Sequence, residues 1–176
     1  DLSGANLSGG AFHGANLQRA NLLQAIAQEV DLSGANLTEA NFYAVDFSGS
    51  NLAGATLIGT SLTKTNLTAI NLAGADLTGA LLSEANLRGA NMRGANLAQA
   101  DLPTVDMSQA DLRGTNFEGA NLTWSIMVGA DLTGANLAGA KLGGADLSGA
   151  NLAGAILDGA RLCKTKLPTG MDNSNC

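Results

Sequence analysis

A five-residue unit repeats from Leu2 to Leu167 without one insertion or deletion, and this register limits what the chain can fold into. Residues 130–134 read Ala-Asp-Leu-Thr-Gly, and we call the central Leu position i, so that a block runs from i−2 to i+2. Over the 34 blocks, position i is Leu in 26, Phe in four, Met in three and Ala once, and it is never polar. Because each repeat contacts chiefly its neighbours, we expect one continuous body with a narrow apolar interior.

The period of five fits neither regular secondary-structure element, since a helix repeats every 3.6 residues and a strand every 2. Positions i−2 and i share one side of a short extended segment, after which the chain must turn. Position i+2 is Gly in 20 of 34 blocks, which supplies the positive φ of a tight turn. Position i−1 is Asn or Asp in 24 of 34, and such side chains hydrogen-bond nearby backbone at corners. A short strand and a corner, repeated with the chain always turning in the same direction, predict a coil whose turns stack.

Tandem Ala-(Asp/Asn)-Leu-x-Gly blocks resemble the pentapeptide-repeat family, and the resemblance covers essentially the whole chain. It implies an all-β fold, a right-handed quadrilateral β-helix with four blocks and therefore 20 residues in each coil. For this chain that means a solenoid of about eight coils over residues 1–167 and a short C-terminal capping tail over residues 168–176. We expect positions i−2 and i inside, with the Asn and Asp of i−1 mostly exposed. Ala27, the one small residue at i, would lie one coil before Phe47, so that small packs beside large.

The charge and the hydropathy pattern exclude two classes of partner. The net charge is −6 and the pI is near 4.5, which disfavours a nucleic-acid binder, because contacts with phosphates need a basic surface. No run of 18 or more apolar residues occurs, so no transmembrane helix is expected. We therefore expect neither a nucleic-acid partner nor a membrane span.

Residues that could carry chemistry are few. His13 is the single histidine and lies at an outward position, without the neighbours that a catalytic triad or a zinc site needs. Asp111 and Asp131 would stack one coil apart, about 4.8 Å by strand spacing, and could hold a cation. Arg93 and Arg113 on the same side would instead neutralise them, and we favour this second interpretation. An unbroken rod also lacks a concave site, so we expect no enzyme, no cofactor, no metal and no small-molecule substrate.

Outward apolar residues gather on two adjoining sides of the predicted coil. Side one carries the blocks centred on Leu2, Leu22 and every twentieth residue onward, and side two those centred on Leu7, Ala27 and onward. With Ala, Cys and Pro excluded, nine outward residues are apolar, and seven fall on these sides: Leu23, Ile26, Tyr43, Leu81, Trp124, Ile126 and Val128. Ile58 and Ile156 are the exceptions. Such a patch predicts a surface for a protein partner or a homodimer, with drift of a tolerant repeat as the alternative.

The two cysteines, Cys163 and Cys176, lie close together at the C-terminal end. Pro168 and Gly170 between them allow the chain to turn back, so we predict a disulfide that pins the tail over the open edge of the last coil. Two reduced thiols are the alternative. The tail is similar to the endings of exported family members, which occur in cyanobacteria and in the plant thylakoid lumen. This implies an oxidising compartment, the thylakoid lumen or the periplasm, with the cytoplasm as the alternative.

Two functions compete for this fold. The first is a non-enzymatic structural or protein-interaction rod. The second is implied by the resemblance to family members of the quinolone-resistance type, and is a DNA mimic that inhibits or protects DNA gyrase. Duplex DNA carries about 24 charges over a rod of about 40 Å, whereas this chain carries −6 in total. We therefore favour the interaction rod.

Overall fold

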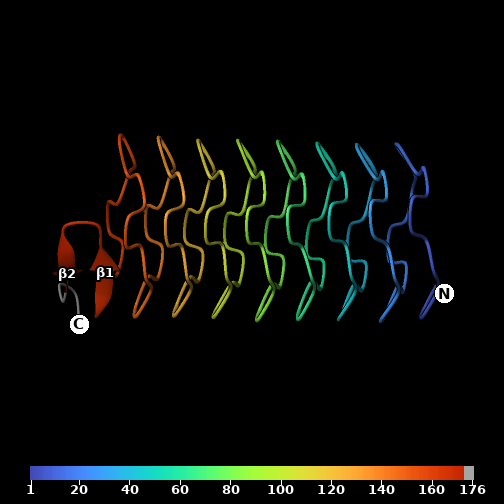
Figure 1. The fold of residues 1–176 in the computed structure, drawn as a ribbon, viewed down its shortest axis with the longest axis horizontal. Coiled ribbons are helices and arrows are strands. Elements are labelled where there is room, and N and C mark those ends of the chain that lie inside the picture. Colours follow the sequence, from blue (N-terminus) through green and yellow to red (C-terminus); the bar gives the residue numbers. More distant parts are fainter. Residues whose placement is uncertain (173–176) are drawn as a thin grey trace.

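The computed structural model describes residues 1–172, which form a rod of stacked coils with the first and last described residues at opposite ends (Figure 1). Residues 20 apart pair in parallel along the whole rod, from Asn6 with Ile26 to Asp146 with Lys166. No helix occurs among the described residues. The chain is therefore the right-handed quadrilateral β-helix that the resemblance to the pentapeptide-repeat family implies.

Backbone hydrogen bonds hold the blocks in the coil, as the block around Leu132 shows. The Leu132 amide donates to the Asn151 carbonyl of the next coil at 2.8 Å, and the Asn151 amide donates back to Ala130 at 2.9 Å. The Ala135 amide donates to the Leu132 carbonyl at 2.9 Å and closes the corner between two sides. At that corner Gly134 has a φ of 67°, a left-handed conformation that glycine adopts without strain. The glycine column of the repeat therefore forms the corners of the coil.

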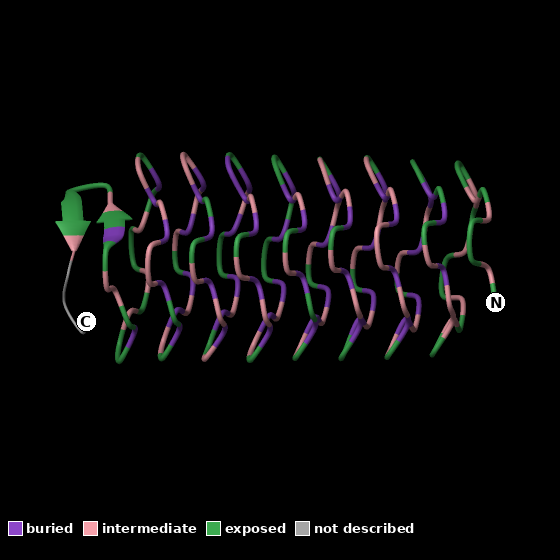
Figure 2. Cartoon of the chain, turned by 90° about the horizontal axis from the view of Figure 1, so that it is seen from below, coloured by how far each residue is buried: buried purple, intermediate pink, exposed green. Residues whose placement is uncertain are grey.

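Positions i−2 and i fill the interior of the rod, and the buried segments in Figure 2 follow them from coil to coil. Leu72, Leu97 and Leu132 are each at most 1% exposed, as predicted for position i. At the ends of the rod the same position is only half-buried, for example at Leu7 and Leu157, because a terminal coil lacks a neighbour on one side. Burial of one leucine stabilises a fold by roughly 1.5–3 kcal/mol, and this contribution recurs with almost every block.

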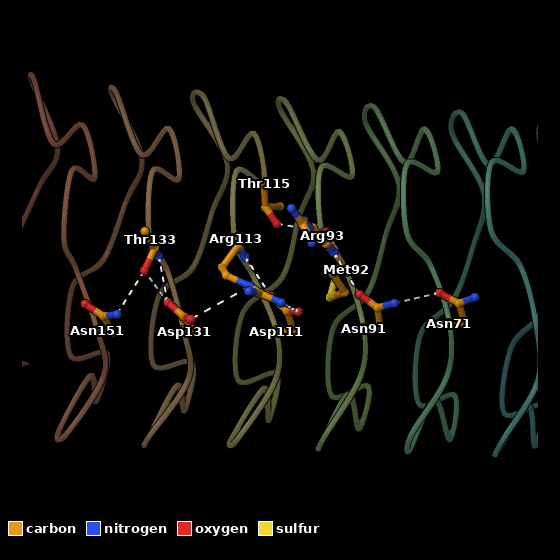
Figure 3. Close-up of polar contacts among 10 residues, drawn as sticks. All are labelled: Asn71, Asn91, Met92, Arg93, Asp111, Arg113, Thr115, Asp131, Thr133 and Asn151. Carbon is orange, nitrogen blue, oxygen red and sulfur yellow. Dashed lines mark hydrogen bonds and ion pairs between the residues drawn. The ribbon is translucent and has the colours of Figure 1, made fainter.

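The Asn and Asp side chains at i−1 are mostly half-buried, so the expectation that they would be mostly exposed was wrong. The reason is that they form hydrogen bonds in two directions. Their Oδ1 accepts the backbone amide two residues ahead, as Asp131 does from Thr133 at 3.0 Å. An Asn Nδ2 also donates to the Oδ1 one coil earlier, from Asn91 to Asn71 at 3.0 Å (Figure 3). These side chains therefore form ladders along the outside of the rod.

A β-hairpin closes part of the C-terminal end and contains the only regular strands among the described residues. Strand β1 spans Thr165–Leu167 and is the last rung of side two, since its Lys166 pairs in parallel with Asp146. Strand β2 spans Gly170–Asp172 and runs antiparallel to β1, so it covers the open edge of that rung (Figure 1). The described part of the tail thus shields one side of the last coil.

The predicted disulfide involves one residue inside and one outside this description. Cys163 is half-buried on side one, in the last coil. Residues 173–176, and with them Cys176, lie outside the described residues. The bond between Cys163 and Cys176 therefore stays a prediction.

Two phenylalanine rings pack against each other near Ala27, the one alanine at position i, which precedes Phe47 by one coil. Phe42 and Phe47 belong to consecutive blocks of one coil, and their ring centroids lie 5.1 Å apart in an edge-to-face arrangement. Ala27 stands one coil before Phe47, and all three side chains are fully buried. Because protein interiors are close-packed, a larger side chain at position 27 would compete for space with the Phe47 ring.

Ala27→Leu gives this position the residue that most blocks carry at i, yet we expect it to lower the free energy of unfolding by about 1–3 kcal/mol. The reason is that extra methyl groups must enter a layer that Phe47 already fills. Met107→Leu, on the same side of the rod, is the matched control and should change stability by less than about 1.5 kcal/mol. Urea unfolding followed by circular dichroism measures both. A more stable Ala27→Leu protein would show that this layer has spare room.

Candidate interaction surface

Within residues 1–172 the rod has no pocket, and no group of three or more His, Cys, Asp and Glu side chains could hold a metal ion. The candidates for contact in this part of the chain are the outward side chains on the four sides and corners. Sides three and four carry the blocks centred on Phe12 and Leu17 and on every twentieth residue after them. The described residues contain no helix that is long and apolar enough to cross a membrane.

Asp111 and Asp131 lie on consecutive coils of side three, and the Arg113 side chain reaches both of them (Figure 3). Its Nη2 lies 2.5 Å from Asp111 Oδ2, and its Nε lies 3.8 Å from Asp131 Oδ2. This is the neutralised arrangement that the sequence analysis favours over a cation site. On the same side, His13 Nδ1 lies 2.8 Å from the Ser33 hydroxyl, so the single histidine takes part in a surface hydrogen bond.

Hydrogen bonds hold the pKa of several i−1 aspartates below the ordinary value. For Asp111 the largest cause is the side-chain hydrogen bond from Arg113, which outweighs the opposing effect of burial. For Asp131 it is the hydroxyl of Thr133, followed by the backbone amide of the same residue. The pKa of Asp31 is lowered in the same way, by a serine two residues ahead. These carboxylates therefore act as ionised acceptors that brace the coil.

The predicted partner surface separates into two clusters along sides one and two. The N-terminal cluster is Leu23, Ile26 and Tyr43, and the C-terminal cluster is Trp124, Ile126 and Val128. Four coils, about 19 Å by strand spacing, separate Tyr43 from Trp124, and Leu81 stands alone between the clusters. Trp124 is 59% exposed and Ile26 46%, whereas Leu23, Tyr43 and Val128 are half-buried. The structure therefore keeps all seven residues on the predicted sides but does not bring them into one patch.

The corner that follows side one, between sides one and two, differs from the other corners in its residues, because most of its left-handed positions are not glycine. Among the described residues, thirteen non-glycine residues have a positive φ, and seven stand at this side-one corner: Gln24, Ala44, Lys64, Glu84, Thr104, Trp124 and Lys164. At the corner after side three every such position is glycine, from Gly14 to Gly154. A left-handed L-residue costs roughly 1–2 kcal/mol, and glycine avoids this cost. The side-one corner thus presents side chains that the coil itself does not require.

Trp124 is the most exposed side chain of the predicted surface, and Gly144, one coil later, makes room for its ring. A Cβ on Gly144 would approach the indole Cε3 to 2.3 Å, so a side chain there would displace the ring. Trp124 itself has a φ of 59°, in the left-handed region. The indole therefore lies against the Gly144 backbone while much of it remains open to solvent.

Two contributions to this surface escaped the sequence analysis. Met171 is 57% exposed on β2 and pairs with Lys166 across the hairpin, so it extends the apolar surface at the end of side two. The expected capping tail, residues 168–176, follows the repeat and therefore belongs to none of the four predicted sides. The number of glycines at i+2, taken over all 34 blocks, does not show that the non-glycine residues gather at the side-one corner. Their recurrence every 20 residues is the signal that would have revealed them.

The sequence matches the family described as pentapeptide repeats, in eight copies, over residues 1–34, 15–52, 40–78, 70–109, 90–129 and 130–167. Together these ranges take in residues 1–167. No curated protein matches the sequence.

Two solved structures show what the rod is similar to. HetL, a pentapeptide repeat protein involved in heterocyst differentiation regulation in the cyanobacterium Nostoc sp. strain PCC 7120, is 31% identical, and the match covers 96% of this chain and 90% of HetL with a TM-score of 0.50. A trypsin-treated form of QnrB1, a plasmid-mediated fluoroquinolone resistance protein, is 20% identical, and the match covers 97% of this chain and 87% of QnrB1 with a TM-score of 0.84. At that identity the likeness to QnrB1 shows a shared fold alone.

We expect the melting temperature to be nearly constant between about pH 8 and pH 5 and to fall below about pH 4. The pKa values of Asp31, Asp111 and Asp131 are lowered in the folded state, so their carboxylates stabilise the fold above the ordinary aspartate pKa. That stabilisation is lost as the pH falls through the folded-state pKa.

Differential scanning fluorimetry across this pH range tests the expectation. Asp31→Asn keeps an oxygen acceptor for the Ser33 amide but removes one titrating group, so its melting temperature should fall less in acid. A melting temperature that rises on acidification would mean that relief of the net negative charge outweighs the lost hydrogen bonds.

Proposed function

The chain belongs to the pentapeptide-repeat family, and we propose that it acts as a non-enzymatic rod that binds a protein partner through sides one and two. One observation carries the proposal: outward apolar side chains and non-glycine left-handed corner residues coincide on the same part of the rod. Trp124 has both properties, since it is exposed, apolar and left-handed.

The stability of the coil accounts for neither feature. Interior packing uses positions i−2 and i, so an exposed side chain such as Ile26 or Leu81 adds little to the core. The corners need only a positive φ, which glycine provides at lower cost. Backbone strain that the fold does not require is most often kept where a site uses it. A partner that covers the side-one corner would bury the same side chains.

Trp124→Ala combined with Tyr43→Ala should weaken partner binding and leave the melting temperature nearly unchanged. Both residues project outward, so their removal leaves the buried columns intact. The matched control is Ile58→Ala with Ile156→Ala, because these outward apolar residues lie on side four. Sedimentation velocity measures self-association of the wild type, the double variant and the control. Affinity capture with each of these three proteins measures binding of other partners.

The double variant at Trp124 and Tyr43 is expected to lose contacts that the wild type and the side-four control retain. If the wild type is monomeric and the double variant keeps every partner, the apolar residues of sides one and two reflect drift and the proposal fails. Inhibition of gyrase supercoiling by the wild type at low micromolar concentration would favour the alternative function instead.

That alternative is a DNA mimic acting on DNA gyrase, and the surface charge speaks against it. Side four is the most acidic, and its acidic residues are Glu39, Asp76, Glu118 and Asp158. Arg19 shares this side, and its Nε lies 2.7 Å from Glu39 Oε2. Four carboxylates on one side, one of them paired, fall far short of a duplex, which carries a charge about every 1.7 Å along its axis.

We also propose export to an oxidising compartment, either the thylakoid lumen or the periplasm of a cyanobacterium. The two cysteines at the end of the chain support this, since a disulfide persists only outside a reducing compartment. Closing a loop of this length would stabilise the fold by about 3 kcal/mol and tie the tail to the last coil.

Titration of free thiols in the unfolded, unreduced protein is expected to find none, because Cys163 and Cys176 are predicted to be joined. Reduction before unfolding serves as the control and should release both thiols. Two reactive thiols without reduction would refute the disulfide and remove the support for export. The cytoplasm would then be the favoured location.

A further inference from the structure

Three cations gather at the C-terminal end of side one. Lys141 and Arg161 pair in parallel on consecutive coils, and Lys164 stands at the corner of the Arg161 block. All three residues are exposed, and within residues 1–172 none of them forms an ion pair, whereas most other cations of the rod do. On side one the nearest acid is Asp101, two coils before Lys141. Next to side one, Asp146 is paired with Lys166, and Asp172 lies on β2 opposite Thr165. The last three blocks of side one itself carry three cations and no acid.

The backbone between these cations lacks a side chain at one outward position. Gly143 is the only glycine at i+1 in the whole register, where other blocks carry a side chain. It does not have a positive φ, and a Cβ there would meet nothing closer than the Cys163 carbonyl at 3.7 Å. Neither backbone geometry nor packing therefore requires a glycine at position 143. The strip between Lys141 and Gly144 is half-buried and carries no side chain at position 143.

The exposed indole borders the same strip. Trp124 lies against Gly144, and its backbone amide donates to the Gly143 carbonyl at 2.9 Å. The Gly144 amide in turn donates to the Cys163 carbonyl at 2.8 Å, so rung bonds hold the three coils in register. An aromatic face, uncovered backbone and three unpaired cations thus lie together on a rigid surface. We call this surface, formed by Trp124, Lys141, Gly143, Gly144, Arg161 and Lys164, the basic corner.

We propose that the basic corner binds a short acidic peptide segment that carries an apolar side chain between its carboxylates. This inference rests on the proposed function and adds the chemistry of the partner. Lys141, Arg161 and Lys164 would pair with the carboxylates, and the apolar side chain would pack on the Trp124 indole over the uncovered backbone. Ion pairs that the bound peptide partly shields from water contribute more to the binding free energy than ion pairs in open solvent.

The dimensions of the basic corner favour a peptide over a nucleic acid. The patch spans two coil spacings, about 10 Å, which matches about three residues of an extended peptide. A duplex has about six phosphates over that length, twice the number of cations, and it would continue over Asp101 and the acidic residues of side two. A short acidic segment can end where the positive surface ends.

The probe is a labelled decapeptide in which glutamates flank two leucines, compared with the same peptide carrying glutamine in place of glutamate. Fluorescence anisotropy measures binding. Trp124 is the only tryptophan of the chain, so its emission reports on this site alone. The glutamate peptide is expected to bind, to shift the tryptophan emission and to weaken with added salt, whereas the glutamine peptide should bind at least about tenfold more weakly.

A triple variant and a matched control locate the site. Lys141→Gln, Arg161→Gln and Lys164→Gln together should weaken binding of the glutamate peptide by about tenfold or more. Arg19→Gln, Lys64→Gln and Arg88→Gln change the net charge equally but lie elsewhere, and they should change the affinity by less than about twofold.

Gly143→Leu fills the uncovered strip, and it should weaken binding while the melting temperature stays unchanged, because position 143 is outward and free of close contacts. Equal binding of the two peptides, or equal losses in the two triple variants, would overturn the proposal. Tighter binding of a single-stranded oligonucleotide through the same three cations would also overturn it, in favour of a nucleic-acid surface.

These results are separable from those for the proposed function. If the glutamate peptide does not bind but the variant at Trp124 and Tyr43 still loses a partner, the acidic chemistry is wrong and the interaction rod stands. If neither experiment shows an effect, sides one and two are not a binding surface.

Discussion

The parallel pairing of residues 20 apart is the constraint on which the rest of this structure depends. It places each position of the block directly over its counterpart in the coils before and after. Position i is therefore enclosed by its own column, and a polar group there would be buried without a partner. Position i+2 must turn the chain, so it takes a positive φ at every corner. A single inserted residue would shift every later column, which explains why the register runs unbroken from Leu2 to Leu167. The outward positions are the ones that the pairing leaves free to vary.

The same pairing gives the outer Asn and Asp ladders a direction, and this direction explains where aspartate occurs. An Asn Nδ2 donates to the Oδ1 one coil earlier, as Asn51 does to Asp31 at 3.1 Å, whereas an aspartate carboxylate can only accept. An Asn placed one coil after a residue that has no side-chain Oδ1 would leave its donor without that partner. Aspartate follows one coil after such a residue in five places: Ala11 by Asp31, Ile26 by Asp46, Thr56 by Asp76, Leu81 by Asp101 and Ile126 by Asp146.

Where aspartate instead follows Asn, an arginine donates to the aspartate carboxylate. Asp106 follows Asn86, and Arg88 Nη1 donates to its Oδ2 at 3.1 Å; Arg113 serves Asp111 in the same way (Figure 3). The acidity of the chain is therefore largely a product of its ladders, and the number of carboxylates alone is a poor guide to what the surface binds.

The repeated block predicts a coil with positions i−2 and i inside, and the resemblance to the pentapeptide-repeat family adds its four sides and its 20-residue turn. Leu97 and Phe47 needed no information beyond their position in the block. The half-burial of the i−1 side chains could not be read from the block alone, since it arises from hydrogen bonds between coils. The division of the apolar surface into two clusters also depends on distance along the rod. The contact between Trp124 and Gly144 depends on how the indole ring lies against the next coil. Properties of one block were thus predictable, and properties of contacts between coils were not.

The distribution of corner residues bears on the choice between a binding surface and drift. If the repeat tolerated any residue at i+2, thirteen non-glycine residues would spread evenly over four corners. They instead number seven after side one, three after side two, none after side three and three after side four. A left-handed Thr104 is especially costly, because a β-branched side chain fits that conformation poorly. Since every corner has the same backbone geometry, the fold gives no reason for one corner to bear most of this cost. The partner contact that we propose along that corner would give one, and it would account for the presence of apolar and basic side chains on the same line of the rod.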